Sequence, residues 1–459
     1  MNISRLRNLF VLLTALLSAG AVARAEPDVS KETARPAPPW LRDGVIYEIF
    51  PRDFSPAGNL NGVTARLDEL KGLGVTILWL MPVHPIGEKF RKGEFGSPYS
   101  IKDYYAIDPN YGTVEDLKHL VAEAHRRGLK VIMDCVADHT AWDSVMMAHP
   151  EFYKQDAHGK LLPPVPEWTD VAGLNYANPQ LREYMIAMLK HWLQTCDVDG
   201  FRCDVASMVP TDFWEQARAE LEKVKPDIML LAEASKPELL LKAFDIDYDW
   251  PLLGALNKVL IGGVPASDLK ATWNKSRLEF PQGSLHMRVS DDHDEARAVA
   301  RYGIRGALAA SALMFSLDGV PLLYNGMEVG DATESGDPAL FEKLLIFWHP
   351  KERPSLHRIY QDLIKLRKDH PAFRNDRVAW LRDSDEDDLV AILRSDEKDE
   401  FVTVINFSNR PVSGRLEVPH DQEFRPVKIP GMPDFSTAGF PSFQLNGFEW
   451  RIYHRSVMK

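Results

Sequence analysis

The 459-residue sequence predicts an α/β protein whose main part is a (β/α)8 barrel, the TIM-barrel fold. Apolar runs without polar alternation recur along the chain, as expected for parallel strands buried on both faces, and helix-like sequence follows each run. An open doubly wound sheet is the competing fold, but no G-x-G-x-x-G motif follows the first run. The eight runs are residues 44–50, 75–82, 130–137, 200–205, 228–233, 244–248, 284–290 and 320–325.

Helix start and stop signals lie between these runs. Residues 113–127 open with Thr113 and two acidic residues and end before Gly128, which predicts a capped helix. Residues 179–194 follow Asn178 as a cap and begin with a proline at the first helical position. A third helix is predicted at residues 211–224.

The sequence divides into four parts. Residues 1–25 read as a signal peptide, 26–39 as a proline-rich linker, and 40–376 as the barrel, with an inserted excursion at 141–178 after the third strand. From residue 377 to 459, short alternating apolar stretches separated by turn signals predict a C-terminal antiparallel β-sandwich.

The first 25 residues have the three parts of an export signal. Arg5 and Arg7 form the basic start, residues 9–23 the apolar middle, and Ala23-Arg24-Ala25 an A-x-A cleavage site. An uncleaved membrane anchor is the alternative. We therefore predict a protein exported to the periplasm or secreted from a bacterium, without stable membrane association.

The net charge limits the expected partners, and the cysteine content argues against a fold that needs a disulfide framework. A net charge of -12 disfavours nucleic acid and anionic membranes as partners, so a neutral substrate is expected. The three cysteines, Cys135, Cys196 and Cys203, make a poor disulfide framework, and we interpret them as small buried hydrophobic residues.

Three strand-like runs end on carboxylates, at Asp204, Glu233 and Asp294. Strand ends at the C-terminal face of a (β/α)8 barrel form its active face. Arg202 lies two residues before Asp204 on the same strand face and favours its ionised form, whereas the apolar neighbours of Glu233 raise its pKa. Such a pair suits glycoside cleavage with retention, with Asp204 attacking and Glu233 as acid and base. His139 and His293 are candidate donors to sugar hydroxyls.

These segments resemble the conserved regions of the α-amylase family of glycoside hydrolases. The matching stretches lie at residues 47–52, 97–105, 134–139, 200–204, 233, 293–294 and 319–328. The resemblance implies that Asp204 is the nucleophile, Glu233 the acid/base and Asp294 the stabiliser of the distorted sugar. It further implies a substrate-binding set made of Tyr99, Asp134, His139, Arg202 and His293.

Two residues depart from the family pattern, which has asparagine where Asp138 and Asp292 stand. Each added carboxylate is expected either to raise the pKa of neighbouring carboxyls or to offer a cation ligand. In members with structural calcium the asparagine at position 138 is a ligand, so the resemblance makes Asp138 a Ca²⁺ candidate. The segment 205–208 lacks the Lys-His pair of many members, which leaves calcium open. No organic cofactor is expected.

We therefore predict an α-amylase-type enzyme that cleaves α-1,4 bonds in starch-like glucans or maltooligosaccharides with retention. A transglycosylase, a cyclomaltodextrinase or a trehalose-forming isomerase uses the same intermediate and stays an alternative. A sugar-binding homologue with an impaired site is the alternative from another functional class, because Asp138 and Asp292 alter the pattern.

Overall fold

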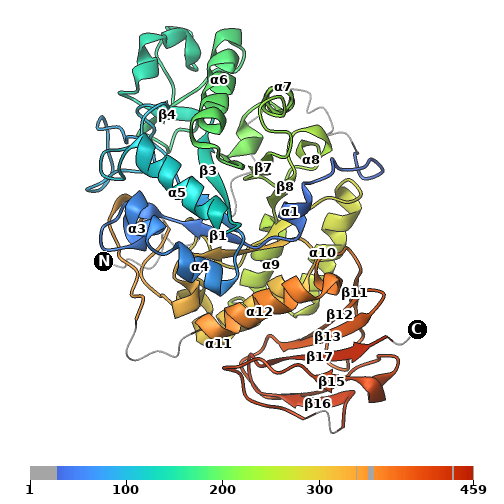
Figure 1. Cartoon of the computed structure of the whole chain (residues 1–459). Helices are drawn as coiled ribbons and strands as arrows, with labels where there is room; N and C mark the ends of the chain where they lie inside the picture. Colours follow the sequence, from blue (N-terminus) through green and yellow to red (C-terminus); the bar gives the residue numbers. More distant parts are fainter. Residues whose placement is uncertain (1–27, 337–338, 350–355, 437–438, 458–459) are drawn as a thin grey trace, which may run out of the picture.

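The computed structural model describes residues 28–336, 339–349, 356–436 and 439–457. A barrel wrapped by helices forms the larger part, and antiparallel strands form a separate layer at the C-terminal end (Figure 1). The predicted signal peptide lies outside the described residues. Among the helices that the structure describes, none is long and apolar enough to cross a membrane.

Eight parallel strands close into a barrel in the order β1-β10-β9-β8-β7-β6-β3-β2, which confirms the predicted fold class. Each strand lies within one of the predicted apolar runs. Their bounds are β1 Ile46–Ile49, β2 Ile77–Leu80, β3 Lys130–Val136, β6 Gly200–Asp204, β7 Met229–Ala232, β8 Ile246–Tyr248, β9 His286–Arg288 and β10 Val320–Tyr324.

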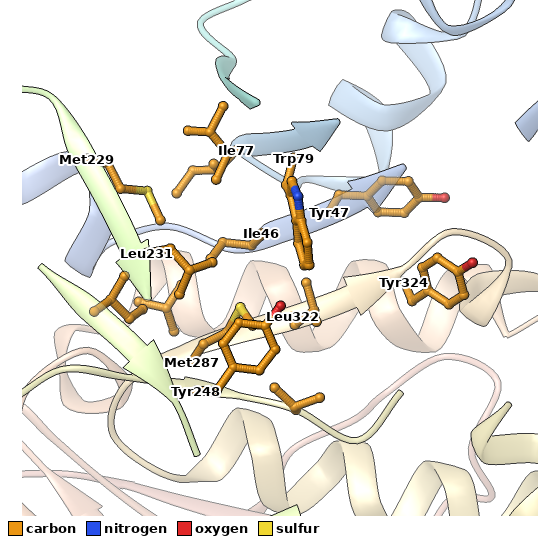
Figure 2. Close-up of a cluster of buried hydrophobic side chains, with 14 of the residues drawn as sticks. Ile46, Tyr47, Ile77, Trp79, Met229, Leu231, Tyr248, Met287, Leu322 and Tyr324 are labelled. Atoms are coloured by element: carbon orange, nitrogen blue, oxygen red, sulfur yellow. The ribbon is translucent and has the colours of Figure 1, made fainter. Parts of the chain in front are cut away.

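The barrel interior has an apolar layer beneath a polar one. Residues two apart on a strand point to the same side of the sheet, so Ile46 and Glu48 both point into the barrel. Ile46 lies in the apolar layer, and Glu48, one step nearer the end of the strand, lies in the polar layer. Ile77, Met229 and Leu322 extend the apolar layer across the barrel (Figure 2). Full burial of such a side chain contributes about 1.5–3 kcal/mol. This packed layer fixes the strand ends from which the polar side chains project.

The predicted helices form with the expected caps. The Thr113 hydroxyl accepts from Asp116 N (3.2 Å) while the Asp116 carboxylate accepts from Thr113 N (2.8 Å), a capping box that starts α5. Asn178 caps α6. The twelve α-helices of the described residues are α1 Pro39–Arg42, α2 Pro51–Phe54, α3 Leu60–Thr64, α4 Leu67–Leu73, α5 Val114–Arg126, α6 Pro179–Cys196, α7 Thr211–Leu221, α8 Leu239–Lys242, α9 Trp250–Leu260, α10 Ser267–Glu279, α11 Ala298–Ser316 and α12 His357–Asp369.

The excursion after the third strand is fastened to the barrel rim. It contains an antiparallel pair, β4 His139–Ala141 and β5 Val171–Gly173, and two 3₁₀ turns at Val145–Ala148 and Pro150–Phe152. Leu174 N donates to the Asp138 carbonyl at 2.8 Å. The excursion therefore begins at the two residues, Asp138 and His139, that belong to the predicted site.

The C-terminal part is the predicted β-sandwich. A five-stranded sheet in the order β11-β12-β13-β17-β15 and a two-stranded sheet β14-β16 enclose their own apolar cluster, which includes Val402, Leu445 and Tyr453. The strands are β11 Val378–Trp380, β12 Leu389–Ser395, β13 Asp399–Asn406, β14 Val412–Arg415, β15 Arg425–Pro426, β16 Ser442–Leu445 and β17 Trp450–Ser456.

The described part of the predicted linker, residues 28–39, is held against the barrel. Ala34 N donates to the Gln282 carbonyl and Arg35 N to the Leu240 carbonyl, each at 2.9 Å. The Arg35 guanidinium forms ion pairs with Asp245 and Glu222. This stretch thus contributes to the barrel wall despite its proline content.

Candidate active site

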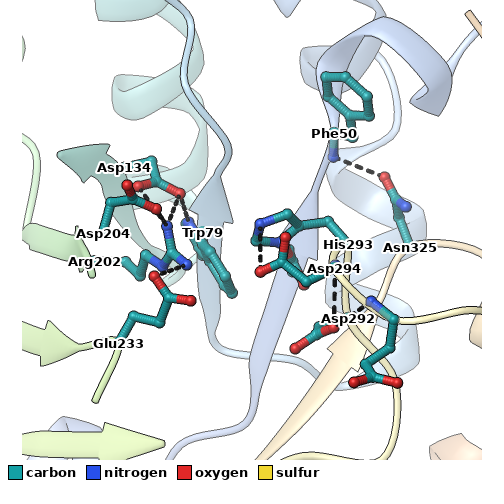
Figure 3. Close-up of polar contacts among 12 residues, drawn as sticks. Phe50, Trp79, Asp134, Arg202, Asp204, Glu233, Asp292, His293, Asp294 and Asn325 are labelled. Atoms are coloured by element: carbon teal, nitrogen blue, oxygen red, sulfur yellow. Dashed lines mark hydrogen bonds and ion pairs between the residues drawn. The ribbon is translucent and has the colours of Figure 1, made fainter. Parts of the chain in front are cut away.

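One buried guanidinium brings together the carboxylates that the sequence singled out. The Arg202 side chain is 0% exposed and lies 2.8 Å from Asp204, 2.8 Å from Glu233 and 3.0 Å from Asp134 (Figure 3). Arg202 and Asp204 share a face of β6, and Asp134 stands beside Arg202 in the register of β3 and β6. Three strand ends therefore converge on one cation.

Glu233 is arranged to hold a proton. Its Oε2 accepts from Val205 N (2.7 Å) and is the oxygen that contacts Arg202, which leaves Oε1 for the proton. Burial raises the pKa of Glu233 well above its usual range, the charges of Asp204 and Asp294 raise it further, and Arg202 opposes the shift. The protonated form is favoured, as a general acid requires.

The backbone at Val205 is unusual and serves this contact. Val205 adopts φ 36° and ψ 47°, a left-handed conformation that costs a β-branched residue on the order of 1–3 kcal/mol. The turn directs Val205 N to the Glu233 carboxylate at the step that follows Asp204. The strained residue thus joins the two carboxylates through the backbone.

Asp204 is arranged to act as the carboxylate of the pair. Its Oδ1 accepts from Arg202 at 2.8 Å, which leaves Oδ2 without that partner. Burial raises the pKa of Asp204, but the charges of Arg202 and His139 oppose this rise. The pKa of Glu233 is raised more strongly than that of Asp204. Of the two groups, Glu233 is the better proton holder and Asp204 the better nucleophile.

The opposite side of the site is built around His293. Its Nδ1 binds the buried Glu48 carboxylate of β1, and its Nε2 lies 3.2 Å from Asp294. Burial disfavours the charged imidazole, yet Asp294 and Glu48 outweigh burial and raise the pKa of His293 to about 10. The side chain of Asp294 is 45% exposed, so it faces solvent from a cationic support.

Tyr99 connects the two sides. Its hydroxyl lies 3.1 Å from Asp134 and 2.7 Å from His293 Nε2, and its ring stacks on the imidazole with centroids 5.3 Å apart. One face of the ring is therefore occupied by His293. Stacking of the other face under a sugar stays a prediction from the resemblance.

A further carboxylate, Asp138, lies near Asp204. Asp138 and His139 are buried, with Asp138 Oδ1 2.6 Å from His139 Nδ1. Burial disfavours the charged imidazole of His139, but Asp138 outweighs it and raises the pKa of His139. The structure thus brings both residues to Asp204.

The acidic and histidine side chains next to Asp138 supply few of the oxygen ligands that calcium needs. Among the described residues, one group of three His, Cys, Asp or Glu side chains, Asp138, His139 and Asp204, places ligand atoms within 4.8 Å of one another. Ca²⁺ takes six to eight oxygen ligands. This group offers one nitrogen, and one of its carboxylates is already bound to Arg202. Calcium binding at Asp138 therefore stays a prediction from the resemblance.

Asp292, the second departure from the pattern, lies in a turn. Its Oδ1 accepts from Asp294 N (3.2 Å) and Glu295 N (3.0 Å) (Figure 3). Burial and the charge of Asp294 raise the pKa of Asp292 well above its usual range. This shift favours the neutral form of Asp292 and so weakens the added negative charge that the sequence predicts.

Three residues of the network escaped the sequence reasoning. Trp79 Nε1 donates to Asp134 (3.1 Å), and Arg202 Nε donates to the Tyr248 hydroxyl (3.3 Å). Glu48 is the acid within an otherwise apolar strand, a signal that could have identified it. All nine predicted site residues, Tyr99, Asp134, Asp138, His139, Arg202, Asp204, Glu233, His293 and Asp294, come together.

Comparison with known proteins places the chain in the alpha-amylase family. A family model described as the alpha amylase catalytic domain matches residues 34–158 and 167–348. Alpha-amylase MalA of Haloarcula japonica is 31% identical over 426 residues, which cover 87% of this chain and 59% of the relative. A cyclomaltodextrinase of Geobacillus thermopakistaniensis is 28% identical, with 81% and 70% covered.

Solved structures agree with the sequence matches. The noncanonic maltogenic alpha-amylase AmyB of Thermotoga neapolitana has a TM-score of 0.82 and 30% identity, covering 91% of this chain and all of that one. An alpha-amylase of Lactobacillus plantarum has a TM-score of 0.79 and 30% identity, covering 91% and 99%. The likeness extends over the barrel and the C-terminal strands, although the chain spans only 59% of the MalA relative.

Proposed function

This chain belongs to the alpha-amylase family of glycoside hydrolases, and we propose that it hydrolyses α-1,4-glucosidic bonds with retention of configuration. The proposed substrates are starch-like glucans and maltooligosaccharides. The observation that carries the proposal is the attachment of Asp204 and Glu233 to the same guanidinium, at 2.8 Å each.

This attachment supports the stereochemistry. Retaining enzymes hold their two carboxyl groups about 5–5.5 Å apart, whereas inverting enzymes leave about 6.5–9.5 Å for a water molecule. Two carboxylates bound to neighbouring nitrogens of Arg202 favour the closer spacing. The exposed side chain of Asp294 and the buried His293 stand opposite this pair.

The proposed reaction has two steps. In the first, Asp204 Oδ2 attacks the anomeric carbon while Glu233 gives its proton to the departing glycosidic oxygen, which leaves a glycosyl ester on Asp204. In the second, Glu233 takes a proton from water, the hydroxide attacks the anomeric carbon, and Asp204 is released as a carboxylate. Arg202 stabilises both carboxylates while their charges change, and His293 with Asp294 binds the sugar.

A cyclomaltodextrinase-type activity is the second candidate. Relatives named cyclomaltodextrinase and maltogenic alpha-amylase match most of this chain. The same glycosyl ester forms from a linear or a cyclic glucan, so the chemistry of Asp204 and Glu233 does not separate them. Analysis of the products distinguishes a preference for linear or cyclic glucans, and it distinguishes hydrolysis from transfer to a sugar acceptor.

The test is incubation of the purified protein with maltoheptaose and with β-cyclodextrin in parallel. Proton NMR of the first product should show the α-anomer ahead of mutarotation, with Glu233→Gln as the inactive control. Faster opening of the cyclic substrate would favour the second candidate, and longer products would indicate transglycosylation. A β-anomer as the first product would contradict the proposal, and so would unchanged substrates. If the substrates stay unchanged but sugar still binds, a sugar-binding homologue with an impaired site would be favoured.

We also propose that the protein is exported, on the strength of the basic start, apolar middle and A-x-A site of residues 1–25. Relatives named intracellular maltogenic amylase share the catalytic domain. N-terminal sequencing of the protein from its natural host should find a chain beginning at Glu26. A chain that keeps residues 1–25 in the cytoplasmic fraction would contradict export.

A further inference from the structure

Outside the catalytic site, the loops after β1, β2 and β10 enclose a pocket of about 180 Å³. A single water needs roughly 10–15 Å³ on this measure, so the pocket admits a larger ligand. None of the catalytic residues contributes to its walls. It is lined by Arg52, Ala57, Gly58, Ile86, Arg91, Phe95, Asp108, Asn110, Tyr111 and Lys343.

Three cations face this pocket without an ionic partner. No carboxylate of the described residues lies within 4.0 Å of a charged nitrogen of Arg52, Arg91 or Lys343. Arg52 is only 5% exposed, and its guanidinium donates to the carbonyls of Gly96 and Leu340 at 3.1–3.4 Å. By contrast, Arg202 has three carboxylates. The charge of Asp53 acts on Arg52 and Lys343 from farther away, but a buried cation with no carboxylate in contact still favours an anionic ligand.

Tyr111 supplies an unused donor at the same place. Its side chain is 3% exposed, and its hydroxyl makes no hydrogen bond of standard geometry. Burial raises the pKa of Tyr111 to about 12, with Arg52 opposing the rise, so the hydroxyl keeps its proton. A buried hydroxyl without an acceptor costs about 1–3 kcal/mol unless a ligand or water satisfies it.

The backbone is shaped to admit the third cation. Gly58 adopts φ 65°, and a Cβ at this position would lie 2.7 Å from Lys343 Nζ. Glycine therefore allows the ammonium to reach the pocket. The one carboxylate in the wall, Asp108, already accepts from Asn110 N at 2.8 Å. Donors and positive charge dominate the lining.

We propose that this pocket is a binding site for a small oxyanion of the phosphate or carboxylate class. Arg52, Lys343 and the Tyr111 hydroxyl would donate to its oxygens, and Phe95, whose ring covers the Arg52 guanidinium at 5.2 Å, limits competition from water. The chain carries a net charge of -12, so this local concentration of cations is not a reflection of overall composition.

The test is calorimetric titration of the whole protein with inorganic phosphate, gluconate and glucose at low ionic strength. Phosphate and gluconate should bind saturably and more weakly as salt rises, whereas glucose should not bind at this pocket. Gluconate and glucose carry similar hydroxyl groups, but only gluconate carries a negative charge, so the pair shows whether the pocket recognises charge or hydroxyl groups. The carboxylates around Arg202 disfavour oxyanion binding in the catalytic site.

Two variants locate the binding. Tyr111→Phe and Lys343→Gln should each weaken phosphate binding about tenfold, the loss of one charge-assisted or buried hydrogen bond. Tyr184→Phe on α6 and Lys275→Gln on α10 are matched controls that should bind as the unchanged protein does. Absence of saturable phosphate and gluconate binding, unchanged affinity in both pocket variants, or glucose binding that the two pocket variants weaken as much as phosphate binding would each overturn the proposal. Because no turnover is measured, these outcomes do not bear on the proposed hydrolysis.

Discussion

Asp138 at the end of β3 and Asp292 after β9 are the same replacement, a carboxylate for an amide, in two different surroundings. Asp138 faces an imidazole at 2.6 Å and raises the pKa of His139. Asp292 faces two backbone N–H groups, and burial raises its own pKa. The two carboxyl groups therefore differ in what they contact: Asp138 supports a charge on its neighbour His139, whereas burial and the nearby charge of Asp294 raise the pKa of Asp292.

This difference refines the expectation from the residue pattern, in which both aspartates add negative charge next to the predicted catalytic carboxylates. Asp138 has an imidazole in direct contact that can balance a charge, and this imidazole lies next to Asp204. Asp292 contributes its Oδ1 as an acceptor for the turn, as the oxygen of an asparagine would.

The largest effect is expected for Asp138→Asn. Loss of the counter-ion lowers the pKa of His139, so the charged imidazole that favours ionised Asp204 disappears at a lower pH. The alkaline limb of the kcat/KM profile should therefore move towards acid. Since the pair holds the folded-state pKa of His139 above its unfolded value of about 6.5, its stabilising contribution is present at pH 6 and is lost as pH rises.

Stability measurements at two pH values check independently that Asp138 raises the pKa of His139. Denaturant unfolding of Asp138→Asn should show a loss of about 1.5–3 kcal/mol at pH 6 and a smaller loss at pH 9. A loss that is independent of pH, together with an unmoved activity profile, would mean that Asp138 does not hold a charge on His139.

Asp292→Ala should have the next largest effect. Two backbone donors, Asp294 N and Glu295 N, lose their acceptor, which costs about 1–2 kcal/mol and loosens the turn that carries Asp294. Thermal unfolding and the KM for maltoheptaose report the two consequences. Unchanged stability and KM would show that the turn does not depend on this side chain.

Asp292→Asn should have the smallest effect, within about 0.5 kcal/mol of the unchanged protein, because the amide oxygen replaces the acceptor. The pH dependence of kcat/KM should also stay the same. A clear displacement of the profile would show that Asp292 carries a charge after all and would remove the contrast with Asp138.

The sequence was sufficient for the barrel and for the strand-end carboxylates, because continuous apolar runs and their terminal acids are local signals. The sequence also predicts that Arg202 lies beside Asp204, because residues two apart on a strand share a face. Its contacts with Asp134 and Glu233 come from neighbouring strands, and spacing alone does not reveal them.

Other features depend on burial or on distant pairing. Glu48 and His293 meet across 245 positions in the chain. The raised pKa of Asp292 depends on its complete burial, which residue types do not specify. The left-handed turn at Val205 goes against the preference of a β-branched residue, and only the fold enforces it.

Hydrolysis with retention requires a glycosyl ester at Asp204, with Glu233 as the proton donor. The most direct test is reaction of Glu233→Gln with α-maltosyl fluoride, whose leaving group needs no proton, followed by mass spectrometry of peptides from the acid-quenched protein. The variant should accumulate one maltosyl group on the peptide that contains Asp204. An unlabelled protein, or a label on Asp138 or Asp294 instead, would contradict the assignment.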